Sequence, residues 1–255
     1  MPWDPDRYHQ FQRERALPFE DLLELVHVRP DLDVIDLGCG TGELTARLAR
    51  ALPRSHVVGL DSSPQMLQRA QAVEHPHLHF RQGDLADLTG TWDLIVSNAA
   101  IQWVDDHRAL LPRLFGALRP NGQIAVQIPS NYGHISHRLI LDVASQEPFQ
   151  TALCGWVTHR SVLTIEEYAG IFYDLGAAEI TVFEKVYPHV LPDADAVADW
   201  TRGTALVPYM ERLPEDLQGP FLDRYRDALR AALPTRPVFY PFRRTLFSAI
   251  KPAQP

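Results

Sequence analysis

The chain has 255 residues, a formal net charge of −8 at pH 7 and 45% hydrophobic residues, which is an ordinary composition for a globular protein with a substantial core. No apolar run approaches the roughly 20 residues that a membrane-spanning helix needs, so a membrane-spanning role is excluded. The acidic balance also argues against general nucleic-acid binding, because that affinity comes from a basic surface that neutralises phosphates.

Residues 1–30 are predicted to form an N-terminal lid and a first helix. The segment 8–15 is aromatic and charged, which favours a helical lid over a core element. The polar start lacks the charged and apolar stretches of a signal peptide, so we expect a cytoplasmic protein. The cysteines, Cys39 and Cys154, show neither a disulfide framework nor a metal-ligand spacing.

Short β-rich runs alternate with amphipathic helical stretches between residues 31 and 130, which is the pattern of βα units around a mostly parallel sheet. Residues 119–122, Arg-Pro-Asn-Gly, predict a turn before the last strand of this part. The expected strands are 34–37, 56–60, 78–81, 93–96 and 123–128, and the expected helices are 43–52, 64–72 and 110–118.

The regular βα rhythm ends near residue 130. The stretch up to about residue 160 has helical character and is expected to form an insertion over the carboxyl edge of the sheet. Thr164 and Glu167 predict a capping box that opens a helix ending near Gly176. Further strands are expected at 179–190 and 237–250, the last of them antiparallel, and further helices at 195–206 and 215–233.

A glycine-rich turn, Asp36-Leu37-Gly38-Cys39-Gly40-Thr41-Gly42, joins the first expected strand to the first expected helix. Glycine lets the backbone turn tightly and approach a ligand closely. The spacing G-x-G-x-G differs from the dinucleotide fingerprint G-x-G-x-x-G, and no P-loop lysine follows. Glu43 at the helix start would repel a phosphate, whereas a cofactor with a sulfonium and an amino-acid tail tolerates it.

Polar side chains follow the ends of successive expected strands. Asp36 suits the neighbourhood of a cationic amino-acid tail, directly or through water, and Asp61, about 20 residues on, can accept both hydroxyls of a ribose. Asp84 could accept from an adenine amino group, and Asn98 ends the fourth strand near the expected reactive methyl group. Structural alternatives stay open, because Asp61 also begins a helix-capping sequence and Asp84 also suits a turn.

The chain resembles class I S-adenosylmethionine (SAM)-dependent methyltransferases through VIDLGCGTGELT at 34–45, GLDSSPQML at 59–67, GDLADL at 83–88 and NAAIQWVDDH at 98–107. Trp3-Asp4-Pro5 at the start, and residues 125–129 followed by Asn131, extend the similarity to the trans-aconitate methyltransferase family. This resemblance is weakest over 149–163 and in the C-terminal third. Methyltransferases that act on malonyl-carrier protein share the cofactor motifs.

The resemblance implies an α/β, Rossmann-like fold with a seven-stranded, mostly parallel sheet, flanking helices and a helical cap. Residues 31–130 would form the SAM-binding core, and residues 131–255 the cap, the substrate-binding helices and the remaining strands of a single compact domain. It also implies SAM as cofactor and a monomethyl ester of trans-aconitate, or of a related small polycarboxylate, as product. The implied cofactor-binding residues are Tyr8, Arg15, Asp36, Gly38, Gly40, Asp61, Ser62, Met66, Asp84, Leu85, Asn98, Ala99 and Trp103.

Esterification of a carboxylate needs no strong general base, because the ordinary pKa of a carboxyl group is near ~4, so positioning is expected to dominate and no catalytic residue is assigned. A pocket for several carboxylates must be locally electropositive. Any single arginine or tyrosine among the substrate-binding candidates could equally be a surface or core residue. Besides Arg15, the substrate-binding candidates are His134, Arg138, Tyr187, Arg202, Tyr209, Arg243 and Arg244.

His107 fits a helix start capped by Asp105 or Asp106 better than it fits a general base. Trp103 is expected to line the methyl-transfer pocket, although it could merely pack under the turn. The histidine spacing predicts no metal site, and we expect a monomer that acts on a small molecule. The alternatives are an O- or N-methyltransferase for another metabolite and a non-catalytic SAM-binding protein.

Overall fold

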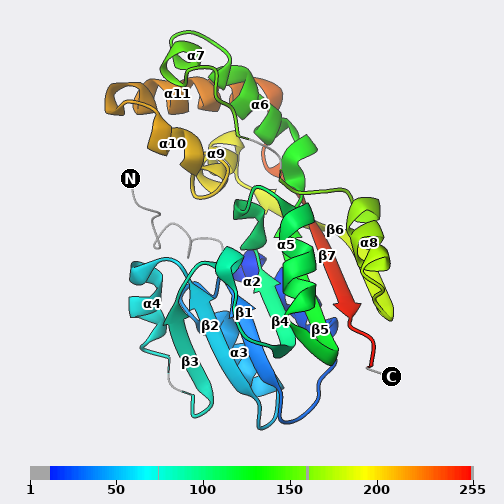
Figure 1. The fold of residues 1–255 in the computed structure, drawn as a ribbon. Coiled ribbons are helices and arrows are strands. Elements are labelled where there is room, and N and C mark those ends of the chain that lie inside the picture. Colours follow the sequence, from blue (N-terminus) through cyan, green and yellow to red (C-terminus); the bar gives the residue numbers. More distant parts are fainter. Residues whose placement is uncertain (1–11, 74, 159–160, 254–255) are drawn as a thin grey trace. The chain divides into compact units, whose positions relative to one another are not determined.

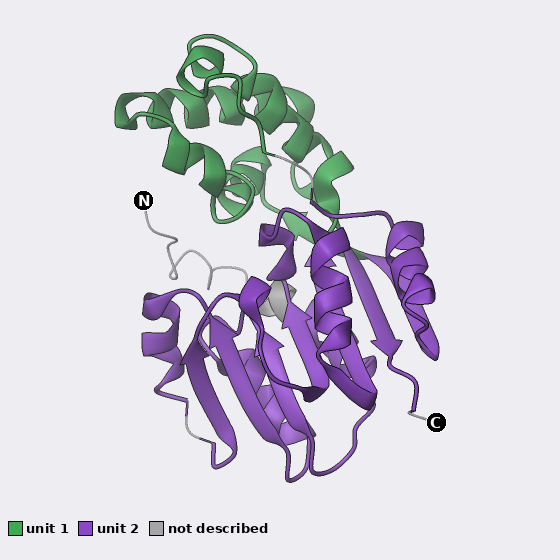
Figure 2. Cartoon of the chain, in the orientation of Figure 1, with its two compact units in different colours: residues 1–15, 130–160, 186–243 green, residues 16–129, 161–185, 244–255 purple. Residues whose placement is uncertain are grey.

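The computed structural model describes residues 12–73, 75–158 and 161–253 (Figure 1). The chain forms two compact units (Figure 2). Residues 16–129, 161–185 and 244–255 make up the sheet unit, and residues 1–15, 130–160 and 186–243 make up the helical unit. The sheet unit therefore contains segments that lie beyond the expected limit of the SAM-binding core at residue 130.

A seven-stranded sheet has the strand order β3-β2-β1-β4-β5-β7-β6 (Figure 1). The pairs from β3 through β5 are parallel, and β7 runs antiparallel to β5. This confirms the predicted α/β class, the number of strands and the antiparallel last strand. The strands are β1 (Asp33–Leu37), β2 (His56–Asp61), β3 (Leu78–Gln82), β4 (Trp92–Asn98), β5 (Leu118–Pro129), β6 (Glu179–Leu191) and β7 (Val238–Ile250).

Helices cover both faces of the sheet because successive strand residues point to opposite sides. On one face, Phe19 and Leu48 of two helices share an apolar cluster with Val34 and Val96. On the other face, the Tyr168 ring stacks on Phe247 at a centroid distance of 4.8 Å. The helices concerned are α2 (Gln12–Glu24), α3 (Glu43–Ala51), α4 (Pro64–Ala70), α5 (His107–Gly116) and α8 (Ile165–Asp174), with 3-10 turns η1 (Leu85–Asp87) and η2 (Ile101–Trp103).

Two predicted helix starts are confirmed by their caps. The Asp106 side chain accepts a hydrogen bond from the Ala109 backbone N–H, and α5 begins at His107. The Thr164 side chain and Glu167 form the predicted capping box of α8, with each side chain accepting from the other residue's backbone N–H. Local sequence therefore fixes where both helices begin.

The turn predicted at residues 119–122 was wrong as a boundary, because these residues lie inside strand β5. The register between β4 and β5 jumps from Trp92↔Leu118 to Leu94↔Gln123, which leaves a local irregularity. Asn121 lies in this segment with a φ of 60°. The turn-forming residues therefore produce an excursion within one long strand rather than its start.

The helical unit is built around a second apolar cluster that includes Trp200, Phe221, Tyr225 and Tyr240. The helix predicted at 195–206 ends four residues early, at Arg202 with Gly203 as its C-cap, and the next helix begins only at Val207. None of the helices among the described residues is long and apolar enough to cross a bilayer. The unit contains η3 (Asn131–Gly133), α6 (Ile135–Ala144), α7 (Phe149–Ala152), α9 (Ala194–Arg202), α10 (Val207–Arg212) and α11 (Glu215–Ala232).

Candidate active site

The predicted cofactor residues follow the ends of four adjacent parallel strands, β3-β2-β1-β4 (Figure 1). The carboxyl ends of parallel strands meet at one edge of a sheet, where ligands of such folds bind. Tyr8 lies outside the described residues, and so does the side chain of Arg15. The residues that the sheet unit brings together are Asp36, Gly38, Gly40, Asp61, Ser62, Met66, Asp84, Leu85, Asn98, Ala99 and Trp103.

The turn between β1 and α3 requires glycine for two different reasons. Gly38 has a φ of 77°, and a Cβ there would lie 2.2 Å from the Cβ of Ala100, so the turn packs directly against the chain after β4. Gly40 has a φ of 56°, and a Cβ there would meet nothing within 4 Å. Gly40 therefore borders open space, as a residue that a cofactor approaches closely should.

Asp61 is oriented by two backbone N–H groups. Its Oδ2 accepts from Gly40 N at 2.9 Å, and its Oδ1 accepts from Ser63 N at 2.8 Å. Each carboxylate oxygen can accept a further hydrogen bond, so both remain able to accept from ribose hydroxyls. Asp61 does not cap α4. The capping residue is Ser63, whose side chain accepts a hydrogen bond from Met66 N.

Asp36 is a buried acid at the end of β1. It is 4% exposed, and its Oδ2 accepts from the Thr45 Oγ1 hydroxyl at 2.7 Å. Burial raises the pKa of Asp36 to about 6, opposed by the Thr45 hydrogen bond and aided by the charge of Asp61. A nearby cation would favour the ionised form, so the site suits the ammonium group of an amino-acid tail.

The chain after β4 combines an unsatisfied acceptor with a strained residue. Asn98 Oδ1 is buried and has no hydrogen-bond partner among the described residues, and Ala99 has a φ of 53°. An ammonium group would supply the donor that Asn98 Oδ1 lacks. Trp103 is 54% exposed, as a side chain that lines a pocket can be. The residues at this edge therefore fit SAM.

Asp84 sits where the adenine contact is expected, but its Oδ1 accepts from Ala86 N and caps η1. Asp84 therefore has the turn-forming role that the sequence left open. Its second oxygen, Oδ2, is the atom that an adenine amino group would reach. Leu85 follows it in η1 and is partly buried.

Neither His107 nor Cys39 is placed for catalysis. The His107 ring is 1% exposed, and its nitrogens lie 2.6 Å from the Tyr168 hydroxyl and 2.8 Å from the Ile101 carbonyl oxygen. Burial lowers the pKa of His107 and raises the pKa of the Cys39 thiol well above its usual range. Proton uptake by His107 as a general base is therefore disfavoured, and so is nucleophilic attack by a Cys39 thiolate.

Three predicted substrate residues come together in the helical unit. Burial lowers the pKa of His134, and the charges of Arg138 and Arg243 lower it further. The His134 ring caps α6, because its Nδ1 accepts from Ser136 N at 3.2 Å. Arg138 is exposed and makes no ion pair within the described part of the chain. The cluster is electropositive, as a polycarboxylate site requires.

The other predicted substrate residues have different surroundings. Tyr209 is fully buried, packs on Phe221 and Trp156, and accepts from Thr158 N through its hydroxyl, so its position argues against substrate contact. Tyr187 is 2% exposed, and Arg202 is half-buried at the end of α9. Arg244, in the sheet unit, is 6% exposed and donates from Nη1 to Gln127 Oε1 at 2.9 Å.

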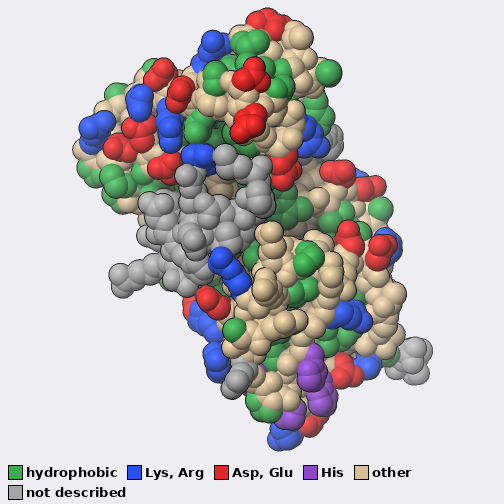
Figure 3. Space-filling view, turned by 90° about the vertical axis from the view of Figure 1, so that its left-hand side faces the viewer, with side chains coloured by type: hydrophobic (Ala, Val, Ile, Leu, Met, Phe, Trp, Pro, Cys, Tyr) green, Lys and Arg blue, Asp and Glu red, His purple; other side chains and the backbone are tan. Residues whose placement is uncertain are grey.

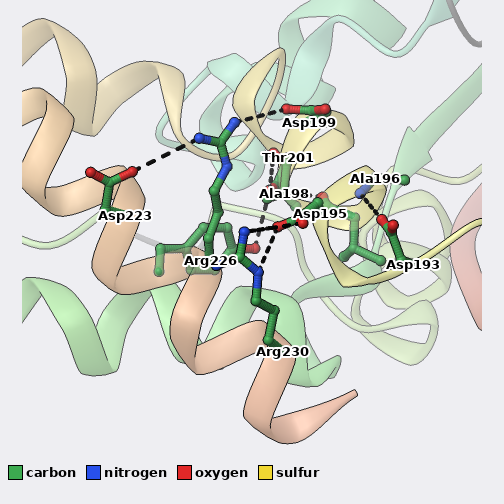
Figure 4. A network of polar contacts seen from close by, with 11 residues as sticks. Asp193, Asp195, Ala196, Ala198, Asp199, Thr201, Asp223, Arg226 and Arg230 are labelled. Carbon is green, nitrogen blue, oxygen red and sulfur yellow. Dashed lines mark hydrogen bonds and ion pairs between the residues drawn. The ribbon is translucent and has the colours of Figure 1, made fainter. Parts of the chain in front are cut away.

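Other arginines of the helical unit form ion pairs between helices. Arg226 pairs with Asp199 of α9 and with Asp223 of its own helix, and Arg230 pairs with Asp195 (Figure 4). The pairs with Asp199 and Asp195 tie α9 to α11. Arg138, by contrast, is exposed and has no ion-pair partner among the described residues, so its charge is available to a ligand.

Sequence analysis missed Thr45, Gln102 and Gln127. Thr45 is fully buried and holds Asp36. Gln127 is fully buried within the otherwise apolar run 124–128, and a polar residue in such a run was the available signal. Gln102 follows β4 and donates to the Ala99 carbonyl oxygen at 2.7 Å.

Histidine side chains gather on part of the surface of the sheet unit (Figure 3). The rings of His56 and His77 have a centroid distance of 5.4 Å, and those of His75 and His77 one of 6.5 Å. Among the described residues no three ligating side chains are arranged to hold a metal ion. The absence of a metal from the mechanism stays a prediction.

Replacement of Gly40 by alanine should weaken SAM binding at least about tenfold, because the added methyl group fills the open space beside the turn. The positive φ of Gly40 should cost an alanine only about 1–2 kcal/mol of stability. Gly176→Ala is the matched control, since Gly176 has a φ of 71° and also faces open space. Calorimetric titration with SAM and thermal denaturation compare the two variants, and equal SAM affinities would contradict this prediction.

Comparison with known proteins agrees with this site. Residues 34–122 match the methyltransferase domain family. The chain is 48% identical to a trans-aconitate 2-methyltransferase of Deinococcus radiodurans, over 99% of both chains. It is 39% identical to one of Variovorax paradoxus, over 92% of both chains.

Solved structures share the fold at low sequence identity. The YcgJ protein of Bacillus subtilis matches with a TM-score of 0.61 and 15% identity, over 94% of this chain and all (100%) of the other. Phosphoethanolamine N-methyltransferase 2 of Haemonchus contortus, solved with SAM, matches with a TM-score of 0.57 and 16% identity, over 93% of this chain and 52% of the other. At 48% identity over nearly its whole length, the chain belongs to the trans-aconitate 2-methyltransferase family.

Proposed function

We propose that the protein transfers a methyl group from SAM to a carboxylate of trans-aconitate and releases a monomethyl ester. The assignment of SAM as cofactor rests on the glycine turn together with Asp36 and Asp61. These two acids lie where the cationic tail and the ribose of SAM would bind. The substrate follows from the family, whose named members align over nearly the whole chain.

When bound, SAM supplies a methyl group on a positively charged sulfur, which leaves as a neutral thioether. Asp61 would hold the ribose through both carboxylate oxygens, since Gly40 and Ser63 already fix its orientation. Asp36 and Asn98 Oδ1 would accept from the ammonium group. These contacts orient the cofactor and leave the transferred group near the chain that follows β4.

The acceptor needs little activation, because a carboxylate with a pKa near ~4 is ionised at neutral pH and already nucleophilic. The protein must align one carboxylate oxygen with the sulfur–methyl bond and exclude water, which can supply about 7–11 kcal/mol. The engaged ring nitrogens of His107 agree with a reaction that needs no general base.

The remaining carboxylates of the substrate need cationic partners. The cluster of His134, Arg138 and Arg243 supports this part of the proposal, because Arg138 is exposed and the charges of Arg138 and Arg243 add to the effect of burial, the larger cause, in lowering the pKa of His134. Charge-assisted hydrogen bonds from arginine to carboxylate are about twice as strong as neutral ones. We further propose a cytoplasmic monomer without a nucleic-acid partner.

A methyl-transfer assay with labelled SAM tests the substrate. The panel comprises trans-aconitate, cis-aconitate, citrate, isocitrate and malonyl-carrier protein. We expect selective labelling of trans-aconitate and a base-labile product, as an ester requires. SAM binding without labelling of any polycarboxylate would reject the substrate and keep the cofactor site, whereas labelling of the carrier protein alone would assign a different acceptor.

A further inference from the structure

Three buried side-chain atoms around the end of β4 have no hydrogen-bond partner among the described residues. They are Asn98 Oδ1, Gln102 Oε1 and Gln127 Nε2. Buried polar atoms in folded proteins are nearly always paired, so each exception calls for an explanation such as a missing ligand. The first suits the ammonium group of SAM, but Gln127 Nε2 is a donor and needs an acceptor instead.

These atoms belong to one connected region of the sheet unit. Asn98 and Gln127 are register partners in the parallel pair β4–β5, so their side chains project from the same face. The Ala99 backbone N–H donates to the Gln127 carbonyl oxygen at 2.8 Å, and Gln102 Nε2 donates to the Ala99 carbonyl oxygen. Ala99, between them, holds a φ of 53°, and such strain is concentrated at binding sites.

Arg244 decides which way the Gln127 amide faces. Arg244 Nη1 lies 2.9 Å from Gln127 Oε1, and a guanidinium has donors only, so the amide must turn its oxygen to Arg244. The Nε2 donors of Gln127 then point away from Arg244. The result is a fully buried donor beside a cation, which is an environment that suits an anionic oxygen rather than a hydroxyl or an amine.

We propose that Gln127 is a substrate-binding residue that donates through Nε2 to a carboxylate oxygen of the acceptor, with Arg244 as the positioning residue that orients it. This proposal rests on the proposed function, because a carboxylate is the acceptor there. It assigns to Gln127 a role that sequence analysis gave to Arg244. The Arg244 charge also offsets the loss of hydration of a carboxylate that reaches this buried donor.

Gln127→Glu is the decisive variant, because a carboxylate can still accept from Arg244 Nη1, and the variant should therefore fold. It lacks the Nε2 donor and carries a charge that repels a carboxylate. We expect trans-aconitate to bind about ten- to a hundredfold more weakly to the variant saturated with S-adenosylhomocysteine, measured by calorimetry. SAM affinity should change less than about twofold. Gln150→Glu, at an exposed position of α7, is the charge-matched control.

The outcomes separate the two proposals. Unchanged binding of trans-aconitate to folded Gln127→Glu would overturn this inference, even if the wild-type protein methylates trans-aconitate. Absence of trans-aconitate binding to the wild-type protein would overturn both. If Gln127→Glu does not fold, Gln127→Met replaces it, because methionine has a similar shape and no N–H donor, and the same weakening of trans-aconitate binding is expected.

Discussion

Asp36→Asn should make the SAM-free protein more stable at neutral pH and make it bind SAM more weakly. Asp36 is buried, and its pKa is raised by burial from 3.8 to about 6. At neutral pH the folded protein therefore holds an ionised group in a place that disfavours ionisation, at a cost of about 3 kcal/mol. Asparagine keeps an oxygen to accept from Thr45 and carries no charge.

The pH dependence follows from the direction of the shift. Below pH 3.8 the Asp36 carboxyl is protonated in both the folded and the unfolded state, so it does not lower the free energy of unfolding. As the pH rises from 3.8 to about 6, the carboxyl ionises first in the unfolded state, and the folded state loses stability relative to it. The free energy of unfolding of Asp36→Asn should therefore rise above that of the wild type across this pH window, and the difference should stay constant at higher pH. We expect a gain of about 2 kcal/mol in the free energy of unfolding at pH 7. This is less than the cost of the buried charge, because the new amide N–H groups are themselves buried.

SAM binding should show the opposite effect, since a hydrogen bond to a charged partner contributes about 1.5–3 kcal/mol and its loss weakens binding about tenfold to a hundredfold. Denaturant unfolding of the SAM-free protein from pH 4 to 8, and calorimetric titration with SAM, measure both quantities. Asp87→Asn, at an exposed position, is the control. A variant less stable than wild type at pH 7, or one with unchanged SAM affinity, would contradict the assigned role of Asp36.

The cofactor edge could be predicted from sequence because its determinants are local. The glycine spacing, the strand before it and the helix after it all fall within residues 33–51. Asp61 ends the next strand, and parallel pairing of β1 with β2 then places it beside Gly40. Apolar and β-branched runs bounded by turn residues also indicated the strands, although β3 is mostly polar and only Leu78 in it is buried.

The buried polar contacts could not be predicted, because they depend on long-range pairing. Gln127 meets Arg244 across 117 residues, and only the antiparallel register of β5 with β7 brings them together. A tyrosine such as Tyr209 looks the same in sequence whether it faces a ligand or an aromatic core. The alternation along β7 was predictable, and it places Arg244 inside and Arg243 outside.

Gly38→Ala should be among the most damaging single substitutions in the sheet unit. An alanine at a φ of 77° costs about 1–2 kcal/mol, and its methyl group would lie 2.2 Å from the Cβ of Ala100, which adds about 1–3 kcal/mol of overpacking. Gly176→Ala isolates the first cost, because its φ is 71° and its Cβ would meet nothing within 4 Å. The difference between the two variants therefore measures the clash alone.

Ala100→Gly should rescue much of that loss. Without the Ala100 Cβ, the nearest atom to a Cβ at residue 38 is the Ala100 Cα at 3.6 Å, an ordinary contact. The double variant should therefore be about 1–3 kcal/mol more stable than the sum of the single effects, a coupling that denaturant unfolding of all four proteins measures. Strictly additive effects would show that the chain after β4 does not pack on this turn. Coupling of the predicted size would show that the turn beside SAM packs directly on Ala100, in the segment that leads to Trp103.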